Sequence, residues 1–399
     1  MLTRKSVKGA LECMIWLKRN NTVAQHSPEL SSSTEATQSN IKIATVNLFN
    51  FIEPPSAFYD FENIYSHGQW QKKCQWFSEL LNQHHPDIVG FQEVFSPEPL
   101  RQLALQQGLT HFAVVDSATL VSDYIYQSPV VALASRFPIL EVYAIEPEAH
   151  LVAAMGLSSE FSFSRKVLRA TVVVPQIGPC DCYVVHFKSK RPGLALEPHP
   201  LGLSLNAPSD LKLHAETKLL TEQALGRWAS TMQRGAEAAL LFHAILARRQ
   251  SAKYPVILMG DFNDSLSLGA LDALTLQGEA LHSNDIKAAG LGHLSDAALA
   301  QVFGHYRLQD AYELFIEANV ADNAVHYREH RAPTHYYGPK GSVLDYVLLS
   351  NEFDASDSRS LAQVVDYQTC DRHLVRPEYE RDAYSTDHAP VMVELALRR

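Results

Sequence analysis

The sequence predicts an α/β fold, because short apolar segments alternate with segments of helical periodicity from Ile41 onward. The apolar segments are rich in Val, Ile and Leu, which suit buried strands. Several of these segments begin or end in Asp, Asn, Glu or His, so polar groups are expected at strand ends. The chain has 399 residues, of which 46% are hydrophobic and 20% charged, so it can bury a large core.

The expected elements follow one another along the chain. Strands are expected at residues 41–47, 87–93, 128–134, 167–174, 181–187, 255–263, 344–349 and 385–395. A helix is predicted over Trp70–Gln83, where apolar residues recur at helical spacing. A second helix is predicted over Asp210–Arg249, which lacks proline, with a break near Gly226 or Gly235.

The segment Pro255–Asn263 is the most informative of these strands. Its apolar run ends at a glycine and then presents a carboxylate and a carboxamide two residues apart, Asp261 and Asn263. Residues i and i+2 of a strand share a face, so both side chains are expected to point into one site. Such a pair suits a hydrolytic water and the oxygen that the water displaces.

Four further segments carry polar residues at a strand end. Asn47 ends IKIATVN, Glu93 ends DIVGFQE, Asp345 lies at the start of LDYVLL, and Asp387 and His388 directly precede the terminal strand. Each of these positions is weak evidence alone, because turn residues often flank strands. Their order along one chain makes them strong evidence together.

Seven motifs occur here in the order found in one known family: TVNLFNF, GFQEVF, SRFPI from Ser135, VVHFKSKRP, GDFN, LDYVLLS and STDH. By these motifs the chain resembles the endonuclease/exonuclease/phosphatase superfamily of Mg²⁺-dependent phosphoesterases, from about Ile41 to Leu397. The resemblance implies a four-layer α/β sandwich, in which two mixed β-sheets pack face to face and are flanked by helices. It places this domain at residues 41–399.

The resemblance also implies a divalent metal, Mg²⁺ or Mn²⁺, held by oxygen ligands. Glu93 is the first expected ligand. Asn47 is expected either to orient that carboxylate or to contact the metal, and Asp387 is expected to complete a second metal position.

The expected catalytic residues are His186, Asp261, Asn263, Asp345 and His388. Asp261 would align or deprotonate the attacking water, while Asn263 and His186 would donate to the phosphoryl oxygens. His388 and Asp345 would form a hydrogen-bonded dyad. The chain departs from the deoxyribonuclease-like pattern at Ser128-Pro129, where those enzymes carry a Glu that supports the active-site histidine.

The net charge of −10 argues against a broad basic surface for nucleic acid. A bound metal and the local cations Lys188, Lys190 and Arg191 could nevertheless hold phosphate. A nuclease acting on DNA or RNA is the preferred interpretation, and a phosphatase or a lipid phosphodiesterase on the same site is the alternative. A catalytically inactive binding module is weaker, since every polar strand end is present.

Residues 1–40 are predicted to be a dispensable extension that ends in a polar linker, rather than a transit-like or regulatory arm. No secretory signal and no stable membrane span are evident, so a cytoplasmic monomer is expected. Cys180 and Cys182 are expected to be reduced structural thiols. The segments 192–209 and 265–337 are interpreted equally well as specificity loops or as surface insertions.

Overall fold

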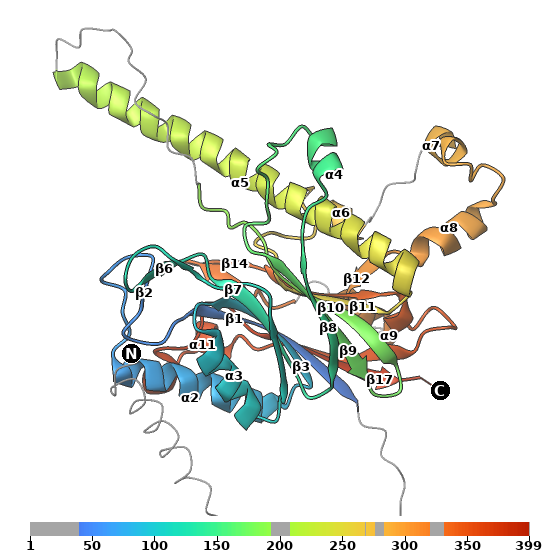
Figure 1. Cartoon of the computed structure of the whole chain (residues 1–399), viewed down its shortest axis with the longest axis horizontal. Coiled ribbons are helices and arrows are strands. Elements are labelled where there is room, and N and C mark those ends of the chain that lie inside the picture. Colours follow the sequence, from blue (N-terminus) through green and yellow to red (C-terminus); the bar gives the residue numbers. More distant parts are fainter. Residues whose placement is uncertain (1–39, 193–207, 268, 276–282, 320–330, 399) are drawn as a thin grey trace, which may run out of the picture.

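The computed structural model describes residues 40–192, 208–267, 269–275, 283–319 and 331–398. The predicted extension lies outside this part of the chain except for Asn40. Two six-stranded sheets pack face to face, and helices cover their outer faces (Figure 1). The predicted four-layer α/β sandwich is therefore confirmed.

The first sheet has the strand order β16-β17-β1-β3-β7-β4. Its strands are β1 (Ile41–Phe51), β3 (Ile88–Val94), β4 (His111–Val114), β7 (Val130–Ser135), β16 (Ala362–Thr369) and β17 (Val391–Leu397). Strand β1 runs parallel to β3 and antiparallel to β17. The chain's first and last described strands therefore lie side by side in the middle of the sheet.

The second sheet has the strand order β12-β15-β11-β10-β9-β8. Its strands are β8 (Ile139–Ile145), β9 (Val167–Val174), β10 (Gly178–His186), β11 (Val256–Asp261), β12 (Leu308–Asp310) and β15 (Asp345–Ser350). Only β10 and β11 pair in parallel within this sheet. Their carboxyl ends therefore meet at the same edge.

The core between the sheets contains apolar side chains from both, including Ile43, Leu133, Val184 and Met259. The sheets approach closely at Gly90, where an added Cβ would lie 2.7 Å from the Met259 side chain. Glycine at this position therefore lets the two sheets pack without displacing Met259.

Helices complete the outer layers. The outer face of the first sheet packs against α2 (His67–His84) and α3 (Pro97–Gln106), and that of the second against α5 (Pro208–Ala252) and α6 (Asp272–Thr275). The other helices are α4 (Ala149–Ala154), α7 (Ser283–Ala288), α8 (Asp296–Gly304), α9 (Ala311–Asn319), η1 (Asn351–Phe353), α11 (Arg372–Val375) and α12 (Tyr379–Asp382). Two small sheets contain β2 (Ala57–Phe58), β5 (Thr119–Leu120) and β6 (Ile125–Gln127), and β13 (His335–Tyr337) and β14 (Lys340–Ser342).

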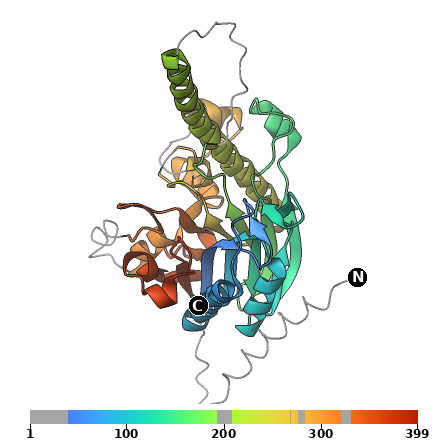
Figure 2. The same cartoon turned by 90° about the vertical axis from the view of Figure 1, so that its left-hand side faces the viewer.

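The predicted break in the long helix is wrong. Helix α5 is a single element of 45 residues, and it projects from the body of the molecule in both views (Figures 1 and 2). A glycine costs only about 1 kcal/mol in a helix relative to alanine, so neighbouring contacts can override it. The contacts near Gly235 include bonds from the buried Arg234 to Asp264 and from Gln233 to Glu237.

Two smaller expectations are also resolved. Cys180 and Cys182 are buried and free, as expected for structural thiols. The strand expected from Ser128 begins two residues later, because Ser128 has a positive φ of 54° that does not fit an extended strand. None of the described helices is both long and apolar enough to cross a membrane.

Candidate active site

Three of the expected catalytic residues lie in register on neighbouring strands of the second sheet. His186 ends β10 and pairs with Asp261, which ends the parallel strand β11. Asp345, the first residue of the antiparallel strand β15, pairs with Asp261 from the other side. The order of the strands therefore brings together residues that are up to 159 positions apart in the chain (345 − 186).

The backbone conformation of the GDFN motif determines where the side chains of Asp261 and Asn263 lie. Gly260 has a φ of 150°, and an added Cβ would lie 2.0 Å from the Val185 carbonyl oxygen, so only glycine fits. Strand β11 ends at Asp261, and Asn263 adopts a left-handed φ of 54°. The expectation that strand alternation aligns Asp261 and Asn263 is therefore wrong. A turn brings the two together, with the Asn263 backbone N–H donating to Asp261 Oδ1 at 2.8 Å.

The carboxylate oxygen Oδ2 of Asp261 is the centre of the site. The amide nitrogens of Asn47 and Asn263 each lie 3.2 Å from it. The Nε2 atoms of His186 and His388 lie 3.5 and 3.9 Å away. Since Asn47 belongs to the first sheet, this oxygen lies where the two sheets meet.

The side chain of Asn263 makes two hydrogen bonds within the protein. Its side-chain nitrogen also donates to the Phe187 carbonyl oxygen at 3.0 Å, so both amide hydrogens have partners. The donation of Asn263 to a phosphoryl oxygen stays a prediction, and it requires release of the bond to Asp261.

The expected hydrogen bond between His388 and Asp345 is present. Nδ1 of His388 donates to Asp345 Oδ2 at 2.8 Å, and both residues are buried. The buried hydroxyl of Thr334 accepts from the backbone N–H groups of Leu344 and Asp345 and so fixes the start of β15. The bond from Nδ1 to Asp345 leaves Nε2 of His388 facing Asp261.

The expected metal ligands Glu93 and Asp387 present oxygens with few protein partners. Glu93 has a left-handed φ of 59° at the end of β3 and accepts one backbone bond, from Asn50 N to Oε2 at 2.9 Å. Oδ1 of Asp387 is buried and accepts no hydrogen bond from the described residues. Carboxylate oxygens with so few protein partners fit a hard divalent cation such as Mg²⁺. The amide nitrogen of Asn47 donates to Asp261, a contact that was not expected, and its role beside Glu93 or the metal stays a prediction.

The electrostatics of the site favour a bound cation. Burial raises the pKa of Glu93, and the neighbouring Asp387 raises it further. Burial also raises the pKa of Asp387 and brings that of Asp261 to about 7. These shifts mean that the carboxylates repel each other and are poorly solvated, and a divalent cation would relieve both costs.

The two histidines differ in charge. Burial lowers the pKa of His186 well below its usual value, and the nearby Arg165 contributes to this shift. Burial also acts to lower the pKa of His388, but Asp345 and Asp261 outweigh it and raise that pKa well above the usual value. His388 is therefore a cation and His186 a neutral donor or acceptor near neutral pH.

Comparison with known proteins places the chain in a family. The model of the endonuclease/exonuclease/phosphatase family matches residues 74–388, which is most of the chain. The chain belongs to this family. Its fold is accordingly that of a phosphoesterase superfamily that includes nucleases and phosphatases.

Solved structures of family members resemble the chain only distantly. The human Nocturnin catalytic domain with bound sulfate is 16% identical, covering 90% of this chain and 95% of that one, with a TM-score of 0.49. D. rerio TDP2 complexed with a single-strand DNA product is 13% identical over 90% and 99%, with a TM-score of 0.44. A family protein from Bacteroides thetaiotaomicron is 17% identical over 90% and 96%, with a TM-score of 0.47. A search of curated proteins found no match.

Lys73 is a site residue that the sequence reasoning missed. It lies on α2, fully buried, and its Nζ donates to the Ser385 carbonyl oxygen at 3.2 Å. Nζ also lies 5.4–5.6 Å from the ring centres of Phe49, Tyr65 and Phe77. Burial lowers the pKa of Lys73 to about 7, while Glu93 and Asp387 act to raise it. A lysine on the apolar face of a predicted helix was the available signal.

Two further residues near the site, Arg165 and His335, were also missed. Arg165 precedes β9, donates to the Phe187 carbonyl oxygen at 3.5 Å, and affects the pKa values of both Glu93 and His186. The His335 ring centre lies 4.8 Å from that of His388. Both come from segments whose position no strand motif predicts.

Two buried side chains near the strand ends differ in their partners. Arg169 on β9 bonds to Glu141 on β8. Nδ1 of His186 forms no hydrogen bond with the described residues, so they provide no counterpart of the supporting Glu that Ser128-Pro129 replaces.

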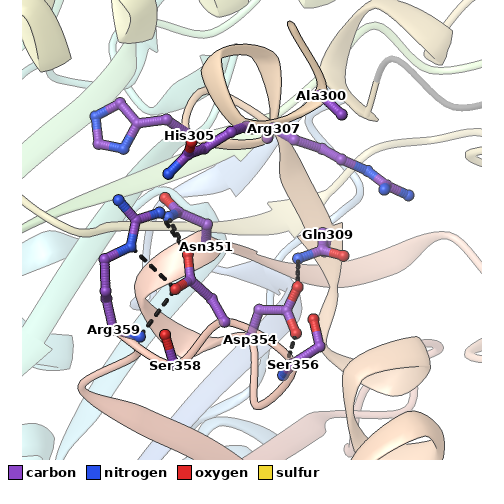
Figure 3. Close-up of a pocket in the computed structure, with 12 residues that line it drawn as sticks. Ala300, His305, Arg307, Gln309, Asn351, Asp354, Ser356, Ser358 and Arg359 are labelled. Atoms are coloured by element: carbon purple, nitrogen blue, oxygen red, sulfur yellow. Dashed lines mark hydrogen bonds and ion pairs between the residues drawn. The ribbon is translucent and has the colours of Figure 1, made fainter. Parts of the chain in front are cut away.

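A pocket of about 390 Å³ lies at the opposite end of β15 (Figure 3). Its acidic groups are already bonded within the pocket. Asp354 accepts from Gln309, and Asp357 pairs with Arg359. Arg307 extends away from these carboxylates. Among the described residues, those that line this pocket have no buried side-chain nitrogen or oxygen without a partner, whereas His186 and Asp387 at the site do.

Proposed function

We propose that the protein is a divalent-metal-dependent phosphodiesterase that hydrolyses nucleic acid. The observation that carries this proposal is the Asp261 carboxylate, which has a raised pKa and lies within 4 Å of two imidazole Nε2 atoms. A carboxylate with a pKa near 7 suits a general base at neutral pH. The neighbouring Glu93 and Asp387 supply the oxygen ligands that the metal requires.

The metal, Mg²⁺ or Mn²⁺, would be held by Glu93 and Asp387. When bound, it would neutralise negative charge on the phosphoryl oxygens. The remaining steps belong to the protein. Asp261, held by Asn47 and Asn263, orients the attacking water and accepts its proton.

The histidines act on the phosphoryl group. His388 is a cation fixed by Asp345, and its Nε2 donates to a phosphoryl oxygen as negative charge develops there. His186 is neutral and donates through Nε2. Asn263 can donate to the same group once substrate displaces its 3.2 Å bond to Asp261.

Local cations support an anionic substrate. Arg165, Lys188 and Arg191 lie close enough for their charges to influence one another or Tyr59 beside the site. Lys190 contributes less, because it pairs with the buried Asp264 at 2.8 Å. With a net charge of −10 on the whole chain, these cations would grip a short stretch of backbone rather than a long duplex.

A lipid phosphodiesterase is the second candidate, and one observation favours it. Helix α5 exposes Leu225, Trp228 and Met232 at helical spacing. Ser230 lies between Trp228 and Met232 but is buried on the other side of the helix, where it donates to the carbonyl oxygen of Arg191. The exposed apolar stripe is therefore a surface that an amphiphilic substrate could contact.

An activity panel distinguishes the two. Purified protein with Mg²⁺ or Mn²⁺ is offered plasmid DNA, single-stranded oligonucleotides, RNA, inositol phosphates and sphingomyelin vesicles, with Asp261→Asn as the control for contaminating enzymes. We expect hydrolysis of a nucleic acid that is lost in the variant. Hydrolysis of sphingomyelin or inositol phosphates alone would overturn the nuclease assignment, and no hydrolysis of any phosphodiester would overturn the proposal.

A further inference from the structure

A second group of potential metal ligands lies beside the proposed Mg²⁺ position. His335, Asp387 and His388 each offer a ligand atom, and these atoms all lie within 4.8 Å of one another. His335 comes from β13 and forms an isolated β-bridge with His388, so the backbone holds the two imidazoles together. Nothing in the proposed reaction requires His335.

Each of the three side chains can offer a ligand atom. Nδ1 of His388 is bonded to Asp345, which leaves Nε2, whose proton a bound cation must displace. Oδ1 of Asp387 is buried and forms no hydrogen bond with the described residues. The ring of His335 is half-buried and has no hydrogen bond among the residues that the structure describes. A carboxylate that has an unpartnered buried oxygen and lies beside two imidazoles is an arrangement that a cation would satisfy.

The donor set decides which cation fits. Mg²⁺ takes hard oxygen ligands, as Glu93 and Asp387 provide. Two imidazole nitrogens and one carboxylate oxygen instead suit Zn²⁺ and Co²⁺, whose bonds to these atoms are about 2.0–2.2 Å. The ligand atoms must then approach to roughly 3.4 Å of one another in a tetrahedral site. From separations of up to 4.8 Å, the closure required is at most about 1.4 Å, and the half-exposed His335 on a two-stranded sheet can supply part of it.

We propose that His335, Asp387 and His388 bind Zn²⁺ or a similar transition-metal ion at a position distinct from the Mg²⁺ site. Such an ion displaces the proton from Nε2 of His388 into solvent, binds there, and withdraws Asp387 from Mg²⁺. Its binding therefore inhibits hydrolysis. The binding part stands independently of the enzyme's substrate, whereas the inhibition part rests on the proposed function.

Spectroscopy of the metal-free full-length protein tests the binding part. Co²⁺ is titrated in excess Mg²⁺, and its visible absorption, which reports nitrogen coordination, is followed. His335→Phe keeps an aromatic ring against His388 but removes the ligand, and His335→Asn is a second variant in case the first fails to fold. His305→Phe makes the same change at the opposite end of β15 and is the matched control.

We expect a Co²⁺ spectrum that Mg²⁺ does not abolish and that Zn²⁺ does. Both His335 variants should weaken Co²⁺ binding by roughly 10–100-fold, while His305→Phe should not. Unchanged Co²⁺ affinity in the His335 variants, or complete displacement of Co²⁺ by Mg²⁺, would overturn the site.

Activity then tests the inhibition part. Zn²⁺ should inhibit Mg²⁺-supported hydrolysis in the wild type, and His335→Phe should need about tenfold more Zn²⁺ for the same inhibition. Equal sensitivity to Zn²⁺ in both would overturn inhibition through this site. Because the Co²⁺ titration uses no substrate, its result is separate from the choice of nuclease or lipid phosphodiesterase.

Discussion

The two ends of strand β15 differ in how their carboxylates are neutralised. At its start, Asp345 meets Asp261 and His388, with the expected metal ligands Glu93 and Asp387 close by. Beyond its end, Glu352 pairs with the fully buried Arg249 at 2.8 Å and accepts from Ser350. Asp357 is likewise bonded to Arg359.

The pKa shifts follow this difference. Burial raises the pKa values of Asp261, Glu93 and Asp387 at the first end, and protein cations compensate only part of it. At the second end, bonds from Arg249 and Arg359 outweigh burial and lower the pKa values of Glu352 and Asp357. Strand β15 therefore connects two different environments. Arginines of the protein neutralise Glu352 and Asp357 beyond its end, whereas the carboxylates around its start lack sufficient positive charge, as is typical of a functional site.

Metal removal should produce the largest contrast between the two ends. Chelation is expected to abolish hydrolysis, because Glu93 and Asp387 then have no cation to hold, and added Mg²⁺ or Mn²⁺ should restore it. Circular dichroism should show that the fold persists, since no described ion pair beyond the end of β15 depends on a metal. Full activity in excess chelator would rule out a metal-dependent reaction.

The next largest effect should come from Asp261→Asn. The change keeps the shape but removes the charge, so turnover should fall by roughly 10²–10⁴-fold. Asp357→Asn, the same change at the other end of β15, should leave turnover within about twofold, as expected for a surface substitution. Single-turnover hydrolysis at saturating Mg²⁺ measures both. Near-normal turnover in Asp261→Asn would show that Asp261 is not the general base.

The dyad should give a somewhat smaller and non-additive loss. Asp345→Ala and His388→Ala should each lower turnover by about 10²-fold or more, and the double variant should lose little beyond the worse single one. His305→Ala, at the pocket beyond the end of β15, is the control. Fully additive losses would mean that Asp345 and His388 act separately despite their 2.8 Å hydrogen bond.

The sequence predicted the parts of this site that lie on strand ends. Asn47, Glu93, His186, Asp261 and Asp345 are all on strands whose apolar pattern is plain, and the order of the family motifs placed these strands in one fold. Strand pairing and register then determine which of these side chains meet. Sequence alone does not state that β1 lies between β17 and β3, and only that order brings Asn47 to Asp261.

What the sequence missed depends on tertiary contacts. Lys73 comes from a helix, and Arg165 and His335 come from segments that follow irregular chain, so no periodicity places them near Asp261. The continuous helix α5 was missed because side-chain bonds outweigh the low helix propensity of glycine. The position of the Asn263 side chain was predicted from strand alternation, but a left-handed turn brings it to Asp261.

The smallest expected effect is on stability, and it tests the comparison most directly. For Asp261, the pKa is about 7 in the native protein and about 3.9 in the unfolded chain. Between these values the native state holds more protons, so the metal-free protein loses stability as pH rises. Asp261→Asn removes this loss at the cost of the attraction between Asp261 and His388, and it should on balance stabilise the metal-free protein at pH about 8.

Glu352→Gln should do the reverse. Its lowered pKa means that the ionised carboxylate stabilises the fold above its unfolded pKa of about 4.3, and that this stabilisation is lost as pH falls further. The variant weakens the partner of a buried arginine, so it should cost about 2 kcal/mol at neutral pH and progressively less below pH about 4. Thermal unfolding in chelator between pH about 4 and 8 measures both variants against the wild type. Opposite signs that diverge with rising pH are expected, because one carboxylate is strained by the fold and the other is satisfied by it. If both variants shifted the melting temperature in the same direction at pH about 8, the two ends of β15 would not differ in the way that their charges indicate.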